Sequence, residues 1–339
     1  MSETPTLKIL MPERYTLTKG DVDLSAIDEL GEVIVLDHPS REELKEALVD
    51  ADMILVNKTV LDEEVLRDAK KLKYIGECAT GFNNIDIEYC KLRGITVTNV
   101  PTYSSNAVAQ QVFSYILAHY SKVCEYNDFV NNDGWINADT FAPFVFDTDE
   151  VFGKTIGLVG YGKIGKAVAK IADAFGMNVL AYTRSYQKAL DSSANKTTLE
   201  GFIDRAERYV TFVTFDRLLK HSDIVSIHCP LNEESERLFN RETIAKMRNG
   251  AFLINTARGP IVDEDALVDA LESGKLSGAG LDVLDDEPML DTCRLKNIKN
   301  LIVTPHVAWA PYETRKRLVA EVAKNIKAFE EGKPRNVVV

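Results

Sequence analysis

The feature that most constrains the fold is a glycine-rich turn between a predicted strand and a predicted helix. An apolar run at 155–159 leads into three spaced glycines, Gly160, Gly162 and Gly165. Gly160 permits a tight turn, Gly162 lets the backbone approach a pyrophosphate, and Gly165 lets the helix lie against the strand. The first turn of such a helix has N–H groups without helical partners at its positive end, and these stabilise a phosphate. The pattern predicts the first βαβ unit of a dinucleotide-binding domain.

The sequence on both sides of the glycines supports this interpretation. Apolar residues recur at helical spacing from Ile164 to Phe175, which gives the helix one buried face. Gly176 ends the helix, and a second apolar run follows at 177–182. The alternative, a strand, turn and helix without a ligand, is disfavoured because all three parts agree. We expect cofactor contacts from the turn and the start of its helix: Gly160, Tyr161, Gly162, Lys163, Ile164 and Gly165.

Composition excludes several classes of protein. A chain of 339 residues is too long for one common hydrophobic core, so we expect two domains. It has no long apolar stretch and no signal-peptide pattern, so we expect a cytoplasmic protein with no membrane partner. A formal net charge of -12 disfavours nucleic acid and anionic membranes as partners. The five cysteines are widely spaced without any C-x-x-C pair, which indicates reduced thiols and no metal site.

Predicted strands and helices alternate along the chain, which is typical of parallel sheets covered by helices. The early strand-like runs are 7–11, 32–36, 53–56, 72–75 and 95–99, and the late ones are 155–159, 177–182, 223–228, 251–255, 278–283 and 301–304. A predicted helix at 106–130 separates the two groups, after a candidate hinge at Pro101. The helix at 312–331 closes the chain, and we expect it to return to the first domain.

We therefore predict an α/β protein with two Rossmann-like or flavodoxin-like domains, in which the cofactor domain is inserted into the substrate domain. The substrate domain comprises residues 1–101 and 307–339, and the dinucleotide-binding domain comprises residues 102–306. We expect cofactor and substrate to meet in the cleft between the two domains.

Four polar residues follow strands of the second domain, where ligands bind in open α/β sheets. They are Arg258, Asp282, Glu287 and His306. An arginine grips a carboxylate with a planar fork of donors and stays charged at any working pH. A carboxylate beside an imidazole orients the ring and favours its protonated form. His306 paired with Glu287 could therefore donate a proton to a carbonyl oxygen.

Each of these residues has a structural alternative. The arginine alone could form a surface ion pair, and the glutamate could belong to a solvated acidic turn. The histidine could be a core residue, as we expect for His38, His119 and His221. Their joint placement after strands, downstream of a dinucleotide turn, favours a functional role. We also expect cofactor contacts from residues after two of the strands: Cys229, Pro230, Thr256 and Ala257.

The spacing of the four polar residues resembles that of the D-isomer-specific 2-hydroxyacid dehydrogenases, over essentially the whole chain. The resemblance makes Arg258, within Asn-Thr-Ala-Arg-Gly-Pro, the catalytic arginine, and Glu287 and His306 the glutamate and histidine of the proton relay. It makes Asp282 a residue that contacts the nicotinamide. The fold and activity that it implies are those of an NAD(P)-dependent oxidoreductase.

The same resemblance implies the substrate contacts. Family members hold the substrate carboxylate partly with backbone N–H groups of a loop that matches Thr80 and Gly81. A tyrosine that lines the substrate site in some members matches Tyr103, and Trp309 follows the catalytic histidine. Lys58 is a further candidate for substrate contact, with simple exposure to solvent as its alternative.

The stretch Thr-Pro-His-Val-Ala-Trp-Ala and the stretch Val-Ala-Gln-Gln at 108–111 are most similar to the hydroxypyruvate reductase and glycerate dehydrogenase branch. The implied reaction is reduction of a small 2-keto acid to the D-2-hydroxy acid, by a homodimer joined near the 106–130 helix and Trp135. Glu287 argues against formate dehydrogenase, which pairs the histidine with glutamine. Phosphite, a larger 2-keto acid, or a dinucleotide-sensing corepressor role stay open as alternatives.

The position that selects the coenzyme departs from the family's usual pattern. Members that prefer NAD place an aspartate at the end of the second strand, where it binds both ribose hydroxyls. Here Thr183 stands at that position, followed by Arg184 and Ser185. With no carboxylate to repel a 2′-phosphate and a guanidinium to bind it, the sequence favours NADP(H), with NAD(H) as the alternative. The segment 187–213 is longer than in typical members and could cover the adenosine end.

Overall fold

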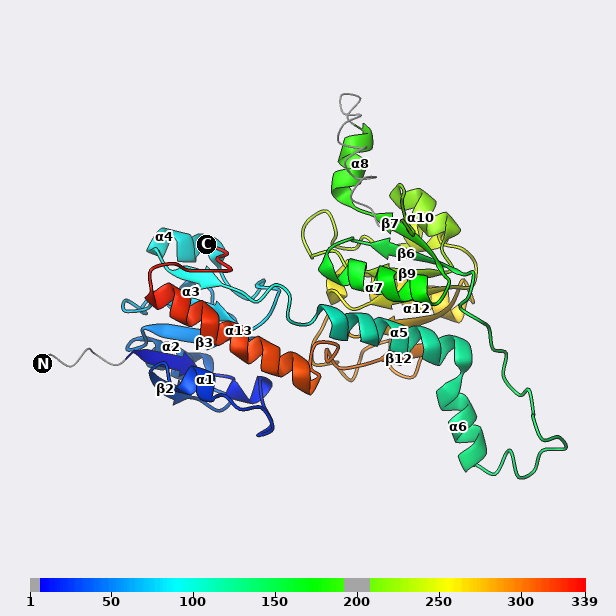
Figure 1. The fold of residues 1–339 in the computed structure, drawn as a ribbon, viewed down its shortest axis with the longest axis horizontal. Helices are drawn as coiled ribbons and strands as arrows, with labels where there is room; N and C mark the ends of the chain where they lie inside the picture. Colours follow the sequence, from blue (N-terminus) through cyan, green and yellow to red (C-terminus); the bar gives the residue numbers. More distant parts are fainter. Residues whose placement is uncertain (1–6, 192–207) are drawn as a thin grey trace, which may run out of the picture. The chain divides into compact units, whose positions relative to one another are not determined.

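The computed structural model describes residues 7–191 and 208–339, which form two compact units (Figure 1). The first unit comprises residues up to 104 and from 309 onward, and the second comprises residues 105–308. The domains expected from the sequence end at 101 and 306, whereas these units end at 104 and 308. Of the long segment 187–213, residues 192–207 lie outside the described residues.

The first unit is a five-stranded parallel sheet with helices on both faces. Its strands are β1 (Lys8–Met11), β2 (Glu32–Val35), β3 (Met53–Val56), β4 (Tyr74–Glu77) and β5 (Thr96–Thr98), in the order β2-β1-β3-β4-β5. Its helices are α1 (Ser25–Asp28), α2 (Arg41–Leu48), α3 (Glu63–Leu66), α4 (Ile87–Arg93) and α13 (Tyr312–Glu330). The first and last of these pack on one face, and the other three cover the opposite face (Figure 1).

The second unit is a seven-stranded parallel sheet in the order β12-β11-β10-β9-β6-β7-β8. Its strands are β6 (Thr155–Val159), β7 (Asn178–Tyr182), β8 (Val210–Phe212), β9 (Ile224–Ile227), β10 (Ala251–Asn255), β11 (Leu276–Leu281) and β12 (Leu301–Val303). Among the described residues, its helices are α5 (Ser105–Ser121), α6 (Val123–Asn131), α7 (Lys163–Ala174), α8 (Arg184–Asp191), α10 (Phe215–His221), α11 (Arg241–Lys246) and α12 (Glu264–Glu272).

Successive side chains of a strand point to opposite faces of this sheet, and helices cover both faces. Within β10, Phe252 and Ile254 point into the core beneath α5 and α7, while Leu253 points into the core beneath α10, α11 and α12. Strands buried on both faces are the near-continuous apolar runs seen in the sequence. The predicted α/β class with parallel sheets is therefore confirmed.

The single helix predicted at 106–130 is wrong, because the structure divides it into α5 and α6. Lys122 stands between them with φ at +52°, in the left-handed region. The carbonyl of Tyr120 accepts the N–H of Asp149 at 3.1 Å, in place of the helical partner that Cys124 would supply. A residue far along the chain thus ends α5, which local periodicity does not reveal.

Two of the three histidines expected in the core lie on the surface. The side chain of His38 is 70% exposed, and His221 is exposed at the end of α10. His119 is partly buried, and its ring stacks on Phe252 with the centroids 4.2 Å apart. Within the described residues, no helix is both long and apolar enough to cross a membrane, and no cluster of His, Cys, Asp and Glu could hold a metal ion.

Candidate active site

The glycine turn between β6 and α7 has the shape that a dinucleotide phosphate requires. Gly160 has a φ of +102°, and a Cβ there would lie 2.6 Å from the carbonyl carbon of His228. A Cβ at Gly165 would overlap the carbonyl oxygen of Gly160. At Gly162 a Cβ would meet no heavy atom of the described chain within 4 Å, so the first turn of α7 borders open space. The residues present therefore fit a dinucleotide, whose phosphates the N–H groups of this turn would bind.

A pocket of about 390 Å³ adjoins this turn at the carboxyl ends of β6, β7 and β9. It brings together many of the predicted cofactor residues: Gly160, Tyr161, Gly162, Thr183, Arg184, Ser185, Cys229 and Pro230. Burial raises the pKa of the Cys229 thiol to about 11, so this cysteine stays protonated and uncharged. The pocket has the position of the adenosine end of a dinucleotide site, beyond the second strand of the βαβ unit.

Arg184, the cation expected to bind a 2′-phosphate, already has a partner. Its Nη1 lies 2.5 Å from Oε2 of Glu234, which stands in the loop after β9. The same guanidinium holds the pKa of the Glu234 carboxyl below its usual range. Of the other predicted cofactor residues on α7, Lys163 is exposed, while the Ile164 side chain packs against the core and leaves its backbone for a ligand.

The loop after β10 is held in place by the buried Asn255. Its Oδ1 accepts the N–H of Ala257 at 3.0 Å, and its Nδ2 donates to the carbonyl of Arg258 at 2.8 Å. The Arg258 guanidinium donates from Nη1 to the Ala257 carbonyl at 2.7 Å. The buried Oγ1 of Thr256 has no hydrogen-bond partner among the described residues, so a polar atom remains there for a ligand.

Close backbone packing joins this loop to the loop after β11. A Cβ at Gly259 would overlap the carbonyl group of Leu284, so only glycine allows the approach. The Leu284 N–H donates to Oε1 of Glu287 at 3.0 Å, which orients that carboxylate. Because β10, β11 and β12 are neighbours in a parallel sheet, Arg258, Glu287 and His306 all follow strands at one edge.

Asp282 fixes the turn that carries the histidine. It is 2% exposed, and its carboxylate accepts the Thr304 hydroxyl at 2.5 Å and the N–H groups of Val307 and Ala308 at 2.9 Å each. The His306 N–H also donates to the Asp282 carbonyl at 2.8 Å. His306 itself has a φ of +54°, an uncommon conformation for a residue with a side chain. The carboxylate therefore stabilises a turn that the local sequence does not favour.

His306 and Glu287 form the pair that the sequence predicts. Nδ1 of the histidine lies 2.7 Å from Oε2 of the glutamate, with side chains 20% and 36% exposed. The glutamate's other oxygen is bound by the Leu284 N–H, so the carboxylate can hold the ring from one side. With Nδ1 engaged, Nε2 is the nitrogen through which this imidazole can exchange a proton with a ligand.

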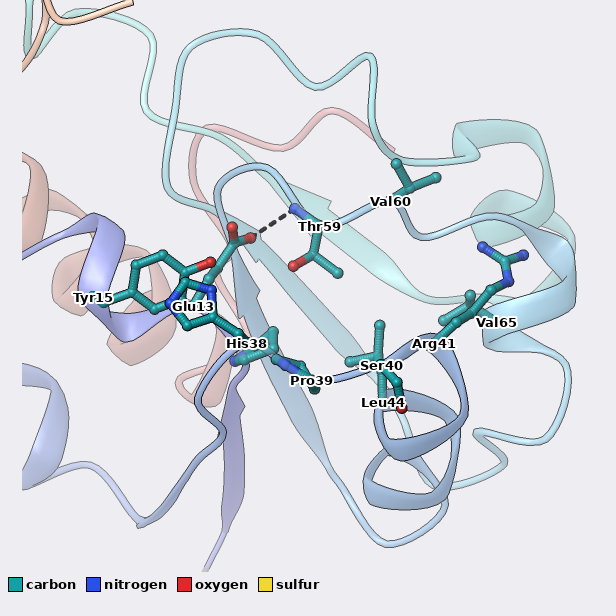
Figure 2. Close-up of a pocket in the computed structure, with 11 residues that line it drawn as sticks. Glu13, Tyr15, His38, Pro39, Ser40, Arg41, Leu44, Thr59, Val60 and Val65 are labelled. Atoms are coloured by element: carbon teal, nitrogen blue, oxygen red, sulfur yellow. Dashed lines mark hydrogen bonds between the residues drawn. The ribbon is translucent and has the colours of Figure 1, made fainter. Parts of the chain in front are cut away.

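In the first unit, the buried Glu13 holds the loop that carries Lys58. Its Oε1 accepts the N–H groups of Asn57, Lys58 and Thr59 at 2.7, 2.8 and 2.7 Å. Figure 2 shows Glu13 extending to Thr59 beside a cavity of about 350 Å³. The Lys58 side chain is exposed, so its contact with a substrate and its exposure to solvent are both compatible with this geometry.

The loop after β4 presents backbone donors at the same edge of the first sheet. The Thr80 hydroxyl donates to the Val100 carbonyl at 2.9 Å, and the Thr80 carbonyl accepts Nδ2 of Asn99 at 2.7 Å. In the part of the chain that the structure describes, the N–H groups of Thr80 and Gly81 have no acceptor. Two adjacent N–H groups on an anchored loop suit a carboxylate.

Tyr103 and Trp309 lie together in the first unit. Tyr103 is 8% exposed and its ring meets Trp309 edge-on, with the centroids 6.4 Å apart. The Tyr103 carbonyl accepts Nε of Arg317 from α13 at 3.1 Å. Both rings belong to the core beneath α1 and α13, so contact between Tyr103 and a substrate stays a prediction.

Comparison with known proteins identifies the family. The model of the family described as D-isomer specific 2-hydroxyacid dehydrogenase, NAD binding domain, matches residues 113–308. The chain belongs to this family. It is thus an NAD(P)-dependent oxidoreductase, and the predicted family and enzyme class are confirmed.

Relatives of this dehydrogenase align along almost its whole length. A hydroxypyruvate reductase from Blautia hydrogenotrophica is 38% identical over 335 residues, which cover 98% of this chain and 99% of the relative. An acyclic imino acid reductase, Bsp5, solved with NADPH and D-Arg, is 30% identical with a TM-score of 0.82 and covers 98% of this chain and 100% of that one. A D-lactate dehydrogenase from Aquifex aeolicus, solved with NAD and lactic acid, is 31% identical with a TM-score of 0.76 and covers 96% of each chain.

Sequence reasoning missed three residues that shape the dehydrogenase's candidate site. Glu13 and Glu234 belong to no motif in the sequence, and Asn255 stands only as the last residue of the predicted strand 251–255. A polar residue that ends an otherwise apolar strand is the one signal that could have drawn attention to Asn255. The other two act on residues 44 to 50 positions away, and no local pattern reports such a contact.

Proposed function

We propose that this dehydrogenase reduces a small 2-keto acid, of the hydroxypyruvate or glyoxylate type, to the D-2-hydroxy acid. The observation that carries the proposal is the pair of His306 Nδ1 and Glu287 Oε2, 2.7 Å apart. Glu287 orients the imidazole and balances its charge, so Nε2 of the protonated ring donates to the keto oxygen. General acid catalysis of this kind contributes about 10²–10⁴-fold to the rate.

Arg258 and the loop after β4 are assigned to the substrate. The guanidinium binds the substrate carboxylate and polarises its keto oxygen, which contributes about 10²–10³-fold in comparable sites. The N–H groups of Thr80 and Gly81 bind the carboxylate, while Lys58, Tyr103 and Trp309 are assigned to the remaining substrate contacts. The bound nicotinamide coenzyme supplies the hydride.

The substrate class is supported by the hydroxypyruvate reductase from Blautia hydrogenotrophica, which is 38% identical over 98% of this chain. The proposed coenzyme is NADP(H), with NAD(H) as an alternative, because Thr183 stands where members that prefer NAD have an aspartate, and Arg184 supplies a cation. The contacts assigned to the coenzyme extend from the glycine turn to Thr256, Ala257 and Asp282.

We further propose a homodimer. Much of the α5 surface packs within its own unit, so the contact is assigned to the segment that follows it, where large apolar side chains are exposed. Trp135 is 54% exposed, Ile136 81%, Phe141 89% and Phe144 93%. Surfaces of this kind mark interfaces. Sedimentation velocity tests the dimer, and a monomer mass would overturn this proposal.

Initial rates test the proposed reaction. Hydroxypyruvate, glyoxylate, pyruvate and larger branched or aromatic 2-keto acids would each be assayed with NADPH and with NADH. We expect the highest kcat/KM with hydroxypyruvate or glyoxylate and with NADPH. Tight coenzyme binding without turnover of any 2-keto acid would overturn the proposal in favour of a dinucleotide-sensing role. Equal or better use of NADH would overturn the coenzyme preference alone.

A further inference from the structure

Two cations and one carboxylate meet at the end of β7, in the pocket beside the glycine turn. Oε2 of Glu234 lies 2.5 Å from Nη1 of Arg184, and Oε1 of Glu234 lies 3.7 Å from Nζ of Lys188. Each carboxylate oxygen therefore faces a positive charge from α8. Arg184 and Glu234 both line the pocket, along with Thr183 and Ser185.

The loop that carries Glu234 is locally anchored. Asn232 Oδ1 accepts the N–H groups of Glu234 and Ser235 at 3.0 and 3.2 Å, and the Asn232 N–H donates to the Ser235 hydroxyl oxygen at 2.8 Å. Ser235 in turn donates from Oγ to the Pro230 carbonyl at 2.7 Å. These hydrogen bonds fix the backbone that carries Glu234, so its carboxylate reaches Arg184 from an anchored position.

The Arg184–Glu234 pair differs from an ordinary surface salt bridge because its cation is a group that a coenzyme phosphate would also need. Arg184 and Glu234 are 50% and 56% exposed, so their attraction adds little to the stability of the fold. The 2′-phosphate of NADP(H) needs the same guanidinium and ammonium groups that the carboxylate holds. The ribose of NAD(H) lacks that phosphate and carries no charge, so it does not need the guanidinium and ammonium groups.

We propose that Glu234 is a specificity-determining residue for the coenzyme, because its carboxylate competes with the 2′-phosphate of NADP(H) for Arg184 and Lys188. This inference rests on the coenzyme site assigned above. With Glu234 present, a phosphate that bears about −1.5 to −2 charges meets two cations and one anion. Glu234 therefore weakens the binding of NADP(H) and reduces the difference in affinity between NADP(H) and NAD(H). The same site can then bind either coenzyme.

The variant Glu234→Gln tests the competition without any substrate. The dissociation constants of NADPH and NADH are measured by coenzyme fluorescence on the full chain, at low and at high salt. We expect the Kd of NADPH to fall about tenfold at low salt, with a smaller gain at high salt, since screening weakens charge effects at exposed groups. We expect the Kd of NADH to stay within twofold of the wild type.

Two controls make the result specific. Glu233→Gln removes the same charge from the neighbouring exposed residue, and it should leave both dissociation constants within twofold. Arg184→Gln in the Glu234→Gln background should abolish the NADPH gain, because the freed guanidinium is its source.

Three outcomes would overturn the inference: an unchanged Kd for NADPH, an equal gain in the Glu233→Gln control, or weaker NADH binding. The last would mean that Glu234 binds the ribose hydroxyls. Because coenzyme binding is read directly, an enzyme that fails to turn over 2-keto acids would still give a clear answer here.

Discussion

At the scale of single residues, Asp282 shows how one buried carboxylate can place a side chain that it does not touch. It binds the Thr304 hydroxyl and the N–H groups of Val307 and Ala308, and thereby holds the turn in which His306 has a φ of +54°. A carboxylate offers only acceptors, whereas these three partners are all donors. No other side chain of the same shape satisfies all of them.

Replacing Asp282 with Asn should therefore misplace the histidine. The amide NH₂ cannot accept, so at least one of the buried donors loses its partner, at a cost of about 1–3 kcal/mol in the free energy of unfolding. Displacement of His306, the proposed general acid, lowers the rate by up to about 10²-fold, so we expect kcat to fall about 10- to 100-fold. Thermal unfolding and steady-state kinetics measure the two effects. Asp286→Asn, an exposed acid nearby, is the matched control, and a wild-type kcat in Asp282→Asn would contradict this account.

The identities of the polar residues at the strand ends could be predicted from the sequence, but their partners could not. Arg258, Glu287 and His306 follow apolar runs, and parallel strands bring such positions to one edge. The sequence predicts that Glu287 and His306 form a pair, and the structure places Oε2 of the glutamate 2.7 Å from Nδ1 of the histidine. The left-handed conformation of His306 and the three donors around Asp282 depend on a turn whose geometry leaves no local signal.

At the scale of elements, α5 packs on β11 because two glycines of that strand leave room for its side chains. A Cβ at Gly280 would lie 2.6 Å from Cγ of Tyr115, and a Cβ at Gly278 would lie 2.9 Å from Cε1 of His119. The His119 ring stacks on Phe252, and its Nε2 lies 3.0 Å from the Ser277 hydroxyl. The sequence predicts both elements, but it does not show that these glycines receive a helix.

Burial of His119 makes the stability of the protein depend on pH. Burial lowers the pKa of His119 from 6.5 to about 4, so the folded form stays neutral where the unfolded chain binds a proton. Above pH 6.5 the contribution is fully present, and it is lost as the pH falls toward 4. Within that window the single proton changes the free energy of unfolding by up to about 1.4 kcal/mol per pH unit.

Replacing His119 with Gln should flatten this dependence, because an amide does not titrate. Midpoints of thermal unfolding between pH 4.5 and 7.5 would show a smaller acid-side decline in His119→Gln than in the wild type. His221→Gln, which removes an exposed histidine, serves as the comparison and should keep the wild-type slope. Parallel curves for all three proteins would show that His119 has no part in the pH dependence.

At the scale of the whole molecule, alternating strands and helices predict two parallel sheets, and the structure has them in the orders β2-β1-β3-β4-β5 and β12-β11-β10-β9-β6-β7-β8. Where prediction failed, the deciding contact joins distant residues. Asp149 ends α5 at Tyr120, and Glu234 binds Arg184 from another strand end. Periodicity reports only neighbours within a few residues, so contacts of this range leave no trace in it.

In the proposed reaction, the His306 imidazole donates the proton to the keto oxygen. The direct measurement is kcat for hydroxypyruvate with saturating NADPH in His306→Ala, alongside the Kd of NADPH for the same variant. We predict that kcat falls about 10²–10⁴-fold while the Kd stays within twofold of the wild type, because this ring acts on the substrate and not on coenzyme binding. A kcat equal to that of the wild type would show that His306 is not the proton donor.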